Sequence, residues 1–547
     1  MLDASAIFAG FGQLSPDQLR AAVTGFLKRN ASPAEKASTV EAGLNSPLGS
    51  SLRESMAKWI VDEIVPVDAL VPKAYLEWRP PVRDAMVFVV TRLSAKRLAP
   101  KLVEQLELPA NTSPEVRLLR LIAKVPGLQK LGQVIARNQH LHPALRKELS
   151  RLEDGIRDVS PSDVRAIVTN ELGNKLKTFQ VKISTSILKE ASVSAVVRFT
   201  WVDRATGKRE RGVFKVLKPY IREYFAEDMD YLQALANYFG DRHHTYGFAP
   251  DLIPDTFRKV RRLLQHEVNF DREQLTLLQA ADQYRSFRGV RIPRVIQTLC
   301  TSRITALSEE QGVKVTNAIA RSPAPTRRRV AEQLVEAIVA VPLFSSKDEA
   351  IFHGDPHAGN LLYNNRTREL ALIDWALREK LNRELRRHLA LLFLMVTLRD
   401  PIGISNEVVA LSQQGNSLTT TQRRIIRNTI GAFMDEPGTG SGATNAMKLL
   451  ERIAIQGIKY PSSLIMLSKV MLTLEGILGD IVGEETDMTF AIVRQVARHW
   501  MVNRSAFRSP LKLRDWVAVQ CSALLFPTRL GIELEQAALD RLLAKQS

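Results

Sequence analysis

Two neighbouring segments constrain the fold of this chain more than any other feature of its sequence. The first is a polar loop, His353-Gly-Asp-Pro-His-Ala-Gly-Asn360, and the second is an apolar run, Leu370–Ile373, that ends at Asp374. The residues after Asn360 have the composition of a short strand, and Asn364-Asn365-Arg366 is typical of a turn. The sequence therefore predicts a β-hairpin with polar side chains gathered at its base.

The spacing of these polar residues fits phosphoryl transfer from ATP. In kinase-like sites a catalytic Asp precedes a metal-binding Asn by five positions, and a second metal-binding Asp follows on the next strand. Asp355 and Asn360 have this spacing, and Asp374 lies where the second Mg²⁺ ligand belongs. Taken singly, each residue favours a turn or a strand cap. Their order around a hairpin favours a metal site, with His353 and His357 in structural roles.

A kinase-like site also needs a lysine on a strand of the small lobe, where it contacts the α- and β-phosphates. Ala195–Val202 and Gly212–Leu217 have the alternation of a second β-hairpin. Lys215 lies inside the returning strand, and Lys218, at the strand's end, is the competing candidate. Strand lysines usually face solvent. The assignment of Lys215 to the site therefore depends on the downstream carboxylates Asp355 and Asp374.

The carboxylate partner of this lysine is expected on the helical stretch 256–281, where Glu267 and Glu273 are both available. A conventional kinase has a glycine-rich loop between its first two strands. The corresponding stretch here, 181–195, contains no glycine. Since glycine lets a backbone approach phosphate closely, we do not expect a plain protein kinase.

Together these residues resemble the UbiB family of atypical kinases, also called ABC1 or ADCK. HGDPHAGNLL is similar to the family's DPHPGN segment, with Ala358 in place of proline, and Lys130-Leu-Gly-Gln133 matches its KxGQ signature. The resemblance covers about residues 115–380. It implies an α+β, two-lobed, protein-kinase-like fold with a helical N-terminal extension, and it implies ATP and Mg²⁺ as cofactors.

The resemblance also implies roles for residues upstream of the loop. Lys130 and Gln133 would come from the helical extension and fold over the cleft. Glu267 would be the glutamate of the family's ExD element, and Glu273 would pair with Lys215. Asp355 would occupy the catalytic position.

The sequence departs from the family pattern in three places. Asn269 replaces the ExD aspartate, Lys189-Glu-Ala-Ser192 replaces the Ala-rich loop, and Asp374-Trp-Ala376 replaces DFG. The first two departures lie in regulatory elements of the family. The sequence therefore does not decide whether this protein inhibits itself or which nucleotide it prefers. The third keeps the metal ligand. Its tryptophan and the HGD triplet also resemble aminoglycoside and choline phosphotransferases.

Three functions follow from these patterns. The leading one is an ATPase or a small-molecule or lipid kinase of UbiB type, a family associated with isoprenoid quinone biosynthesis at membranes. The second is a nucleotide-binding pseudokinase scaffold, against which the intact Lys215, Asp355, Asn360 and Asp374 argue. The third is a small-molecule phosphotransferase, against which KxGQ argues because the helical extension should obstruct a wide acceptor pocket.

At 547 residues the chain is too long for one ordinary core. We predict a helical N-terminal extension carrying KxGQ over 1–175, a kinase-like small lobe over 176–312, and a helical large lobe with C-terminal helices over 313–547. Within the extension, Ser15-Pro-Asp17 and Ser113-Pro-Glu115 each have the composition of a helix start.

The net charge of +18 predicts attraction to polyanions. The expected partners are a nucleotide, a small-molecule or lipid acceptor and the anionic face of a membrane. Nucleic acid is not expected because no nucleic-acid motif accompanies the basic residues. No apolar run reaches the roughly 18 residues of a membrane span, and the early Asp3 argues against a secretory signal. We therefore expect a cytoplasmic protein with peripheral membrane contact.

Overall fold

The computed structural model describes residues 30–136, 158–436, 442–483 and 510–524, apart from residues 48, 72, 248, 251, 513 and 516. The chain divides into two compact units. The first runs to Phe270 and includes Gln297–Ala306, and the second comprises Asp271–Ile296 and the chain from Leu307 onward. The three-part division predicted from the sequence stays a prediction.

The first unit begins as a helical array. Ser113 accepts a hydrogen bond from the Val116 amide at the start of α8, as its sequence predicts, whereas the Ser15-Pro-Asp17 helix start lies outside the described residues. The main helices of this part are α3 (Pro33–Leu44), α4 (Gly49–Trp59), α5 (Val67–Leu70), α6 (Arg79–Arg92), α7 (Ala95–Glu107), α8 (Pro114–Ile122), α9 (Pro126–Ala136), α11 (Pro161–Leu172) and α12 (Lys175–Thr178).

Two longer helices follow, α13 (Pro219–Asp241) and α15 (Leu252–Glu267), with the short α14 (His243–Tyr246) between them. α9 packs against both α13 and α15. Their apolar sides share one core with α6 and α7, in which Leu98, Leu232 and Val260 are fully buried. This core fixes α9, which carries the KxGQ residues, beside the end of α15.

The predicted hairpin is confirmed as β2 (Ser194–Val202) and β3 (Arg209–Leu217), which pair antiparallel with Lys215 opposite Val196. The sheet has the order β1-β2-β3-β5, where β5 is Ile304–Ser308. β1 (Lys182–Glu190) occupies most of the stretch 181–195. Only residues 191–193 connect β1 to β2, and this connection contains no glycine, as the sequence predicts.

The helical stretch predicted over 256–281 is divided in two. α15 ends at Glu267, and α16 (Phe270–Tyr284) begins three residues later. Because the helix is interrupted at Val268 and Asn269, Glu267 and Glu273 lie on different helices. Glu267 belongs to the first unit and Glu273 to the second.

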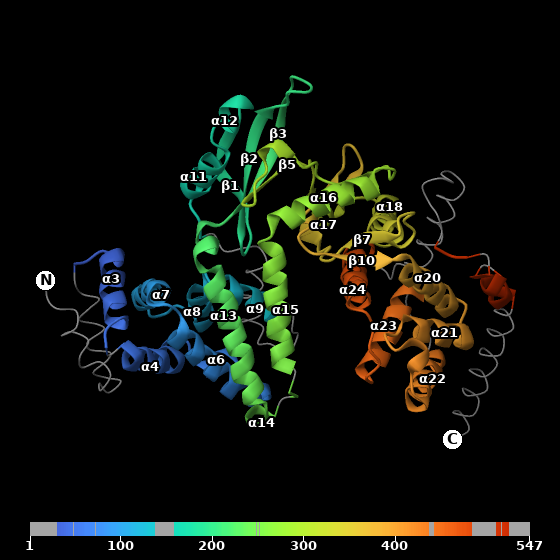
Figure 1. Cartoon of the computed structure of the whole chain (residues 1–547), viewed down its shortest axis with the longest axis horizontal. Coiled ribbons are helices and arrows are strands. Elements are labelled where there is room, and N and C mark those ends of the chain that lie inside the picture. Colours follow the sequence, from blue (N-terminus) through green and yellow to red (C-terminus); the bar gives the residue numbers. More distant parts are fainter. Residues whose placement is uncertain are drawn as a thin grey trace. The chain divides into compact units, whose positions relative to one another are not determined.

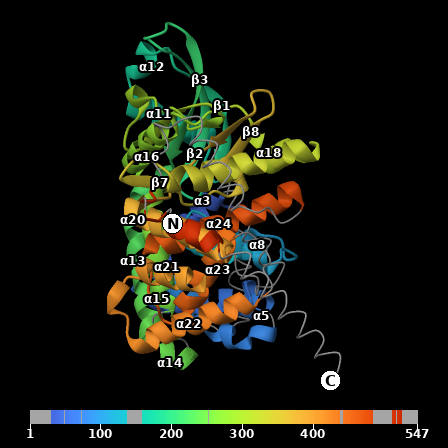
Figure 2. The same ribbon diagram turned by 90° about the vertical axis from the view of Figure 1, so that its right-hand side faces the viewer.

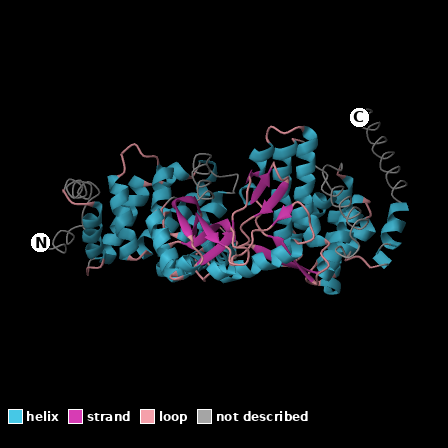
Figure 3. Ribbon diagram, turned by 90° about the horizontal axis from the view of Figure 1, so that it is seen from above, coloured by secondary structure: helices cyan, strands magenta, loops and turns pink. Residues whose placement is uncertain are grey.

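In the second unit, small sheets lie among helices (Figure 3). The predicted hairpin is confirmed as β8 (Leu361–Asn364) and β9 (Glu369–Leu372), within a sheet of order β4-β9-β8-β6. β4 is Val290–Arg291 and β6 is Val313–Lys314. A separate antiparallel pair joins β7 (Glu349–His353) to β10 (Arg378–Asn382).

The remaining helices of this unit pack around these strands. They are α17 (Val315–Ile319), α18 (Ala324–Val335), α19 (Val341–Leu343), α20 (Arg383–Thr397), α21 (Pro401–Leu411), α22 (Thr420–Asp435), α23 (Gly442–Ile455) and α24 (Ser462–Val482). α20 to α23 pack on one another in sequence order, and α23 returns to α20 (Figures 1 and 2). Among the described residues, no helix is both long enough and apolar enough to cross a membrane.

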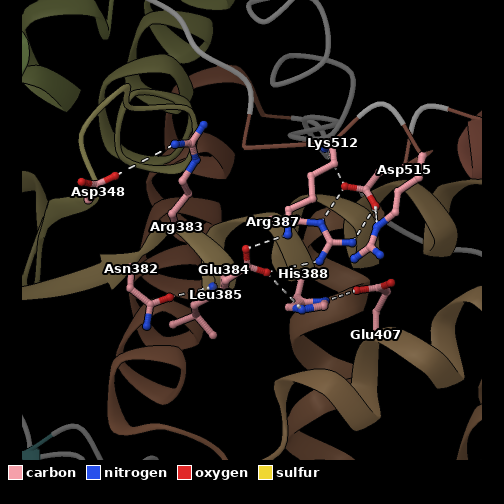
Figure 4. Close-up of polar contacts among 11 residues, drawn as sticks. Asp348, Asn382, Arg383, Glu384, Leu385, Arg387, His388, Glu407, Lys512 and Asp515 are labelled. Atoms are coloured by element: carbon pink, nitrogen blue, oxygen red, sulfur yellow. Dashed lines mark hydrogen bonds and ion pairs between the residues drawn. The ribbon is translucent and has the colours of Figure 1, made fainter.

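A later segment, residues 510–524, attaches to α20 through charges. Arg387 donates two hydrogen bonds of 2.6 Å to the carboxylate of Asp515, and both side chains are nearly buried (Figure 4). Lys512 pairs with Glu384 on the same helix, and His388 pairs with Glu407 on α21. Ser522 donates to Asp400, next to the start of α21.

Candidate functional site

The polar loop of the second unit connects β7 to β8 and is held mainly by backbone hydrogen bonds. His353, at the end of β7, is buried, and its Nε2 lies 3.0 Å from the carbonyl oxygen of Ile373. Its Nδ1 accepts the amide N–H of Asp355 at 3.2 Å. Burial lowers the pKa of His353, which suits this neutral arrangement. The side chain thus has the structural role expected of it.

Asn360 ties the loop to the strand that leads to Asp374. Its side-chain amide donates to the carbonyl oxygen of Asp355 at 3.1 Å, and its own carbonyl oxygen accepts the Ile373 amide at 3.0 Å. Asn360 is buried, and its side-chain NH₂ group makes this contact. Its other side-chain atom, Oδ1, is an oxygen of the kind that can ligate a cation. The same bonds therefore bring Asp355, Asn360 and the residue before Asp374 together.

Asp374 has an unusual backbone conformation, with φ of 61°. A side chain in this left-handed region is uncommon and costs free energy, so its presence at a candidate site is notable. The next residue, Trp375, is fully buried, with its indole N–H donating to Leu372 at 3.1 Å and its ring edge-on to His353. Asp374 itself is exposed, so the buried tryptophan anchors a carboxylate that faces solvent.

The donor set of this loop fits Mg²⁺. Mg²⁺ prefers oxygen ligands and is usually bound by one or two carboxylates together with substrate phosphates and water. The side chains of Asn360 and Asp374 supply such oxygens. Within the described part of the chain, no group of three or more His, Cys, Asp and Glu side chains could hold a metal by itself.

In the first unit, Lys215 lies in the middle of β3 and is partly buried. Its Nζ is 5.7 Å from the centre of the Phe270 ring, within the range of a cation–π contact. Glu273, its predicted partner, is buried in the first turn of α16, in the other unit. The pairing of Lys215 with Glu273 stays a prediction.

Lys218, the competing candidate, is fully buried. Its Nζ lies 2.7 Å from Asp158 and 3.2 Å from Glu190, and the Tyr220 hydroxyl donates to the same Asp158 at 3.0 Å. Burial and the neighbouring Asp158 raise the pKa of Tyr220. This lysine is therefore engaged with two buried carboxylates, which leaves Lys215 as the candidate for phosphate contact.

Lys130 forms an ion pair with Glu267. The second carboxylate oxygen of Glu267 accepts a hydrogen bond of 2.9 Å from Ser192, in the β1–β2 connection. Gln133 is buried one turn after Lys130 on α9. Three segments that are distant in sequence thus meet at one carboxylate.

A comparison with known families matches residues 151–408 to the ABC1 atypical kinase-like domain. Residues 151–408 thus form a domain that is similar to the atypical kinase-like domains of the UbiB/ABC1 family.

The relatives of the chain are distant. An uncharacterised protein of Synechocystis is 27% identical over 77% of the chain and 71% of its own length. The chloroplastic Activity of BC1 Complex Kinase 7 of Arabidopsis thaliana is 23% identical over 68% of the chain and 52% of its own length. The probable protein kinase UbiB of Haemophilus ducreyi is 24% identical over 50% of each chain. The chain thus spans about half the length of the latter two relatives.

A solved structure of Rv3197 with erythromycin, from Mycobacterium tuberculosis, covers 65% of the chain and 87% of its own, with a TM-score of 0.42 and 15% identity. This likeness is too low to bear on the fold. The match to the ABC1 kinase-like domain, together with the mixture of helices and strands, confirms the kinase-like α+β fold expected from the sequence.

The expectation that Lys130 and Gln133 fold over the cleft stays a prediction. KxGQ, the end of α15 and the β1–β2 connection converge on Glu267. Sequence reasoning missed Asp158 and Glu190, the two carboxylates around Lys218. No sequence signal identifies them, because their contacts with Lys218 join positions far apart along the chain.

Proposed function

We propose that this protein is an ATP- and Mg²⁺-dependent atypical kinase or ATPase of UbiB/ABC1 type. The observation that carries the proposal is the loop of the second unit, where Asn360 donates to the Asp355 carbonyl and accepts the Ile373 amide. These bonds join Asp355, Asn360 and the residue before Asp374, which supports the proposed roles of a general base and two oxygen ligands for Mg²⁺. Rigid placement matters because phosphoryl transfer depends on positioning and charge more than on covalent catalysis.

Each candidate residue has a proposed part in this reaction. Asp355 would accept the proton of the attacking hydroxyl or water, and Asn360 and Asp374 would hold Mg²⁺. Lys215, with Glu273 as its proposed partner, would contact the α- and β-phosphates. Mg²⁺ neutralises charge on the phosphates when bound. The bond from the γ-phosphorus to the bridging oxygen breaks, and its electron pair leaves with ADP. The new bond joins the γ-phosphorus to the acceptor oxygen.

The acceptor we propose is a small molecule or lipid, in keeping with the family's association with isoprenoid quinone metabolism. The net charge of +18 supports peripheral contact with an anionic membrane. Sedimentation with vesicles containing anionic lipid tests this contact. Binding at low salt that is lost at high salt is expected, and no binding at low salt would contradict it.

The first experiment measures the thermal unfolding midpoint with and without Mg-ATP for the wild type, Asp374→Ala and Asp348→Ala. Asp348 is a control because its exposed carboxylate lies away from the loop, 4.0 Å from Arg383. A ligand at about 100 times its Kd adds roughly 2.7 kcal/mol of stability. We expect a magnesium-dependent shift in the wild type and the control that is lost in Asp374→Ala.

Phosphate release from Mg-ATP then separates the enzyme from a nucleotide-binding scaffold. Asp355→Ala is expected to lower the rate by roughly 10²-fold or more. Equal rates in Asp355→Ala and the wild type would rule out catalysis by this loop. A thermal shift without any phosphate release would favour a pseudokinase.

A further inference from the structure

A lysine from a distant helix reaches the predicted catalytic aspartate. The Nζ of Lys469, on α24, lies 3.8 Å from Oδ1 of Asp355. The two side chains are 43% and 26% exposed, so both are accessible to a ligand. None of the family motifs considered above includes Lys469.

The position of α24 fixes this contact. α24 packs against β10, and β10 pairs with β7 so that Arg378 lies opposite His353 (Figure 1). The helix buries Leu467, Val470, Met471 and Leu474, whose spacing defines one side of a helix. Lys469 lies off that buried side and is held beside the loop by the packing of its neighbours.

The polar loop has no permanent positive charge of its own. Residues 353–360 include no lysine or arginine, and of the two histidines His353 is buried with a lowered pKa. Yet transfer of a γ-phosphoryl group needs positive charge where the transition state carries negative charge. Lys469 is the sole cation on α24, because the other charged residues of that helix are Glu475 and Asp480.

We propose that Lys469 contacts the γ-phosphoryl group during transfer. This inference rests on the proposed function and adds a residue to it. Before nucleotide binds, the ammonium offsets the charge of Asp355. During transfer it faces the γ-phosphoryl oxygens while the bond to ADP breaks and the bond to the acceptor oxygen forms. The acceptor proton goes to Asp355, and Lys469 stays protonated throughout.

The test compares Lys469→Met, Lys469→Arg and the control Lys448→Met. Lys448 lies on the neighbouring helix α23, pairs with Glu475 at 4.0 Å and is similarly exposed, at 46%. Phosphate release from Mg-ATP is measured across ATP concentrations, together with the thermal midpoint of each variant without ligand. Lys469→Met is expected to lower kcat by about 10²-fold while KM for ATP and the midpoint stay near wild type. An interaction made mainly in the transition state has this signature.

Lys469→Arg should recover most of kcat, and Lys448→Met should match the wild type. An unchanged kcat in Lys469→Met, with turnover still dependent on Asp355, would overturn the inference and leave the proposed function standing. A fall in midpoint with no rescue by arginine, or an equal loss in Lys448→Met, would show a structural role and overturn it as well. A wild type that releases no phosphate would overturn the proposed function, and the role of Lys469 with it.

Discussion

In the first unit, the charged side chains around β3 and α15 are held by other charges, whereas in the second unit the polar loop is held by backbone hydrogen bonds. Lys218 is buried between Asp158 and Glu190. Asp355 and Asn360, by contrast, are positioned through main-chain atoms of the loop and of β9's end. Removing one partner of a buried charge pair leaves an uncompensated charge, while losing one of the loop's hydrogen bonds leaves no buried charge behind. A single substitution should therefore cost more stability in the charge-held region than in the loop.

The largest expected effect on stability is that of Lys218→Met. The change leaves two carboxylates close together and buried without their lysine, and we expect a loss of about 3–5 kcal/mol in the free energy of unfolding. Chemical denaturation, followed by a probe in the first unit, measures it. Lys215→Met, three residues earlier on the same strand and partly buried, is the control and should cost much less. If Lys218→Met and Lys215→Met lost the same free energy of unfolding, the buried charge pair of Lys218 would not be what stabilises this region.

A second test asks whether the difference lies in the kind of contact and not in the unit. The second unit has a charge-held contact of its own between Arg387 and Asp515. Hydrogen bonds from Arg387 hold the pKa of Asp515 below the ordinary value of an aspartate. Its ionised form is thus stabilised by folding, and this contribution is complete above the unfolded pKa and lost as pH falls through the folded pKa.

Asp515→Asn is therefore expected to destabilise the second unit by about 1–3 kcal/mol at pH 7. The difference from the wild type should shrink once the pH falls below 4. Thermal unfolding from pH 7 to pH 2.5 measures this dependence. A difference that stays constant across this range would contradict a charge-held contact.

A third test concerns the partly exposed pair in the first unit. Lys130 and Glu267 have side chains that are 15% and 22% exposed. A double-mutant cycle with Lys130→Ala and Glu267→Gln should give a coupling free energy of about 1 kcal/mol. The pair Arg303–Glu171, which is exposed to a similar degree, is the matched reference. No coupling in the Lys130 cycle would mean that KxGQ is held in place by packing alone.

The smallest expected effect comes from Asp374→Gly. Glycine adopts the φ of 61° without strain, so we expect this variant to be as stable as the wild type or up to about 1 kcal/mol more stable. The Mg-ATP-dependent thermal shift should still be lost, as in Asp374→Ala. Marked destabilisation by glycine would show that the carboxylate, and not the backbone, holds this turn together.

The local patterns in the sequence were sufficient to predict both hairpins. Alternating β-branched and aromatic residues marked β2 and β3, and an apolar run followed by a polar turn marked β8 and β9. The start of α8 at Ser113 was also predicted correctly, because capping is a local interaction.

Two other elements escaped prediction for physical reasons. β1 lacks a clean alternation along Lys182–Glu190, and its pairing with β2 has register shifts, so neither its face nor its extent was evident. The break between α15 and α16 falls at Val268-Asn269, where no proline or glycine marks it.

Contacts between distant segments were beyond the reach of sequence patterns. The burial of Lys218 depends on two carboxylates from separate segments, and the approach of Lys469 to Asp355 depends on how α24 packs. Such contacts are properties of tertiary structure, which periodicity and motif spacing do not encode.

The buried cluster of Lys218, Asp158 and Glu190 also bears on how this chain and its relatives can evolve. Neutral replacement of Lys218 alone leaves two buried carboxylates without their cation, whereas replacement of one carboxylate still leaves a lysine–carboxylate pair, and proteins have few kcal/mol of stability to lose. A neutral residue at position 218 should therefore survive only together with changes at both carboxylates. Across relatives of this chain, we expect a cation at position 218 wherever position 158 or position 190 is acidic.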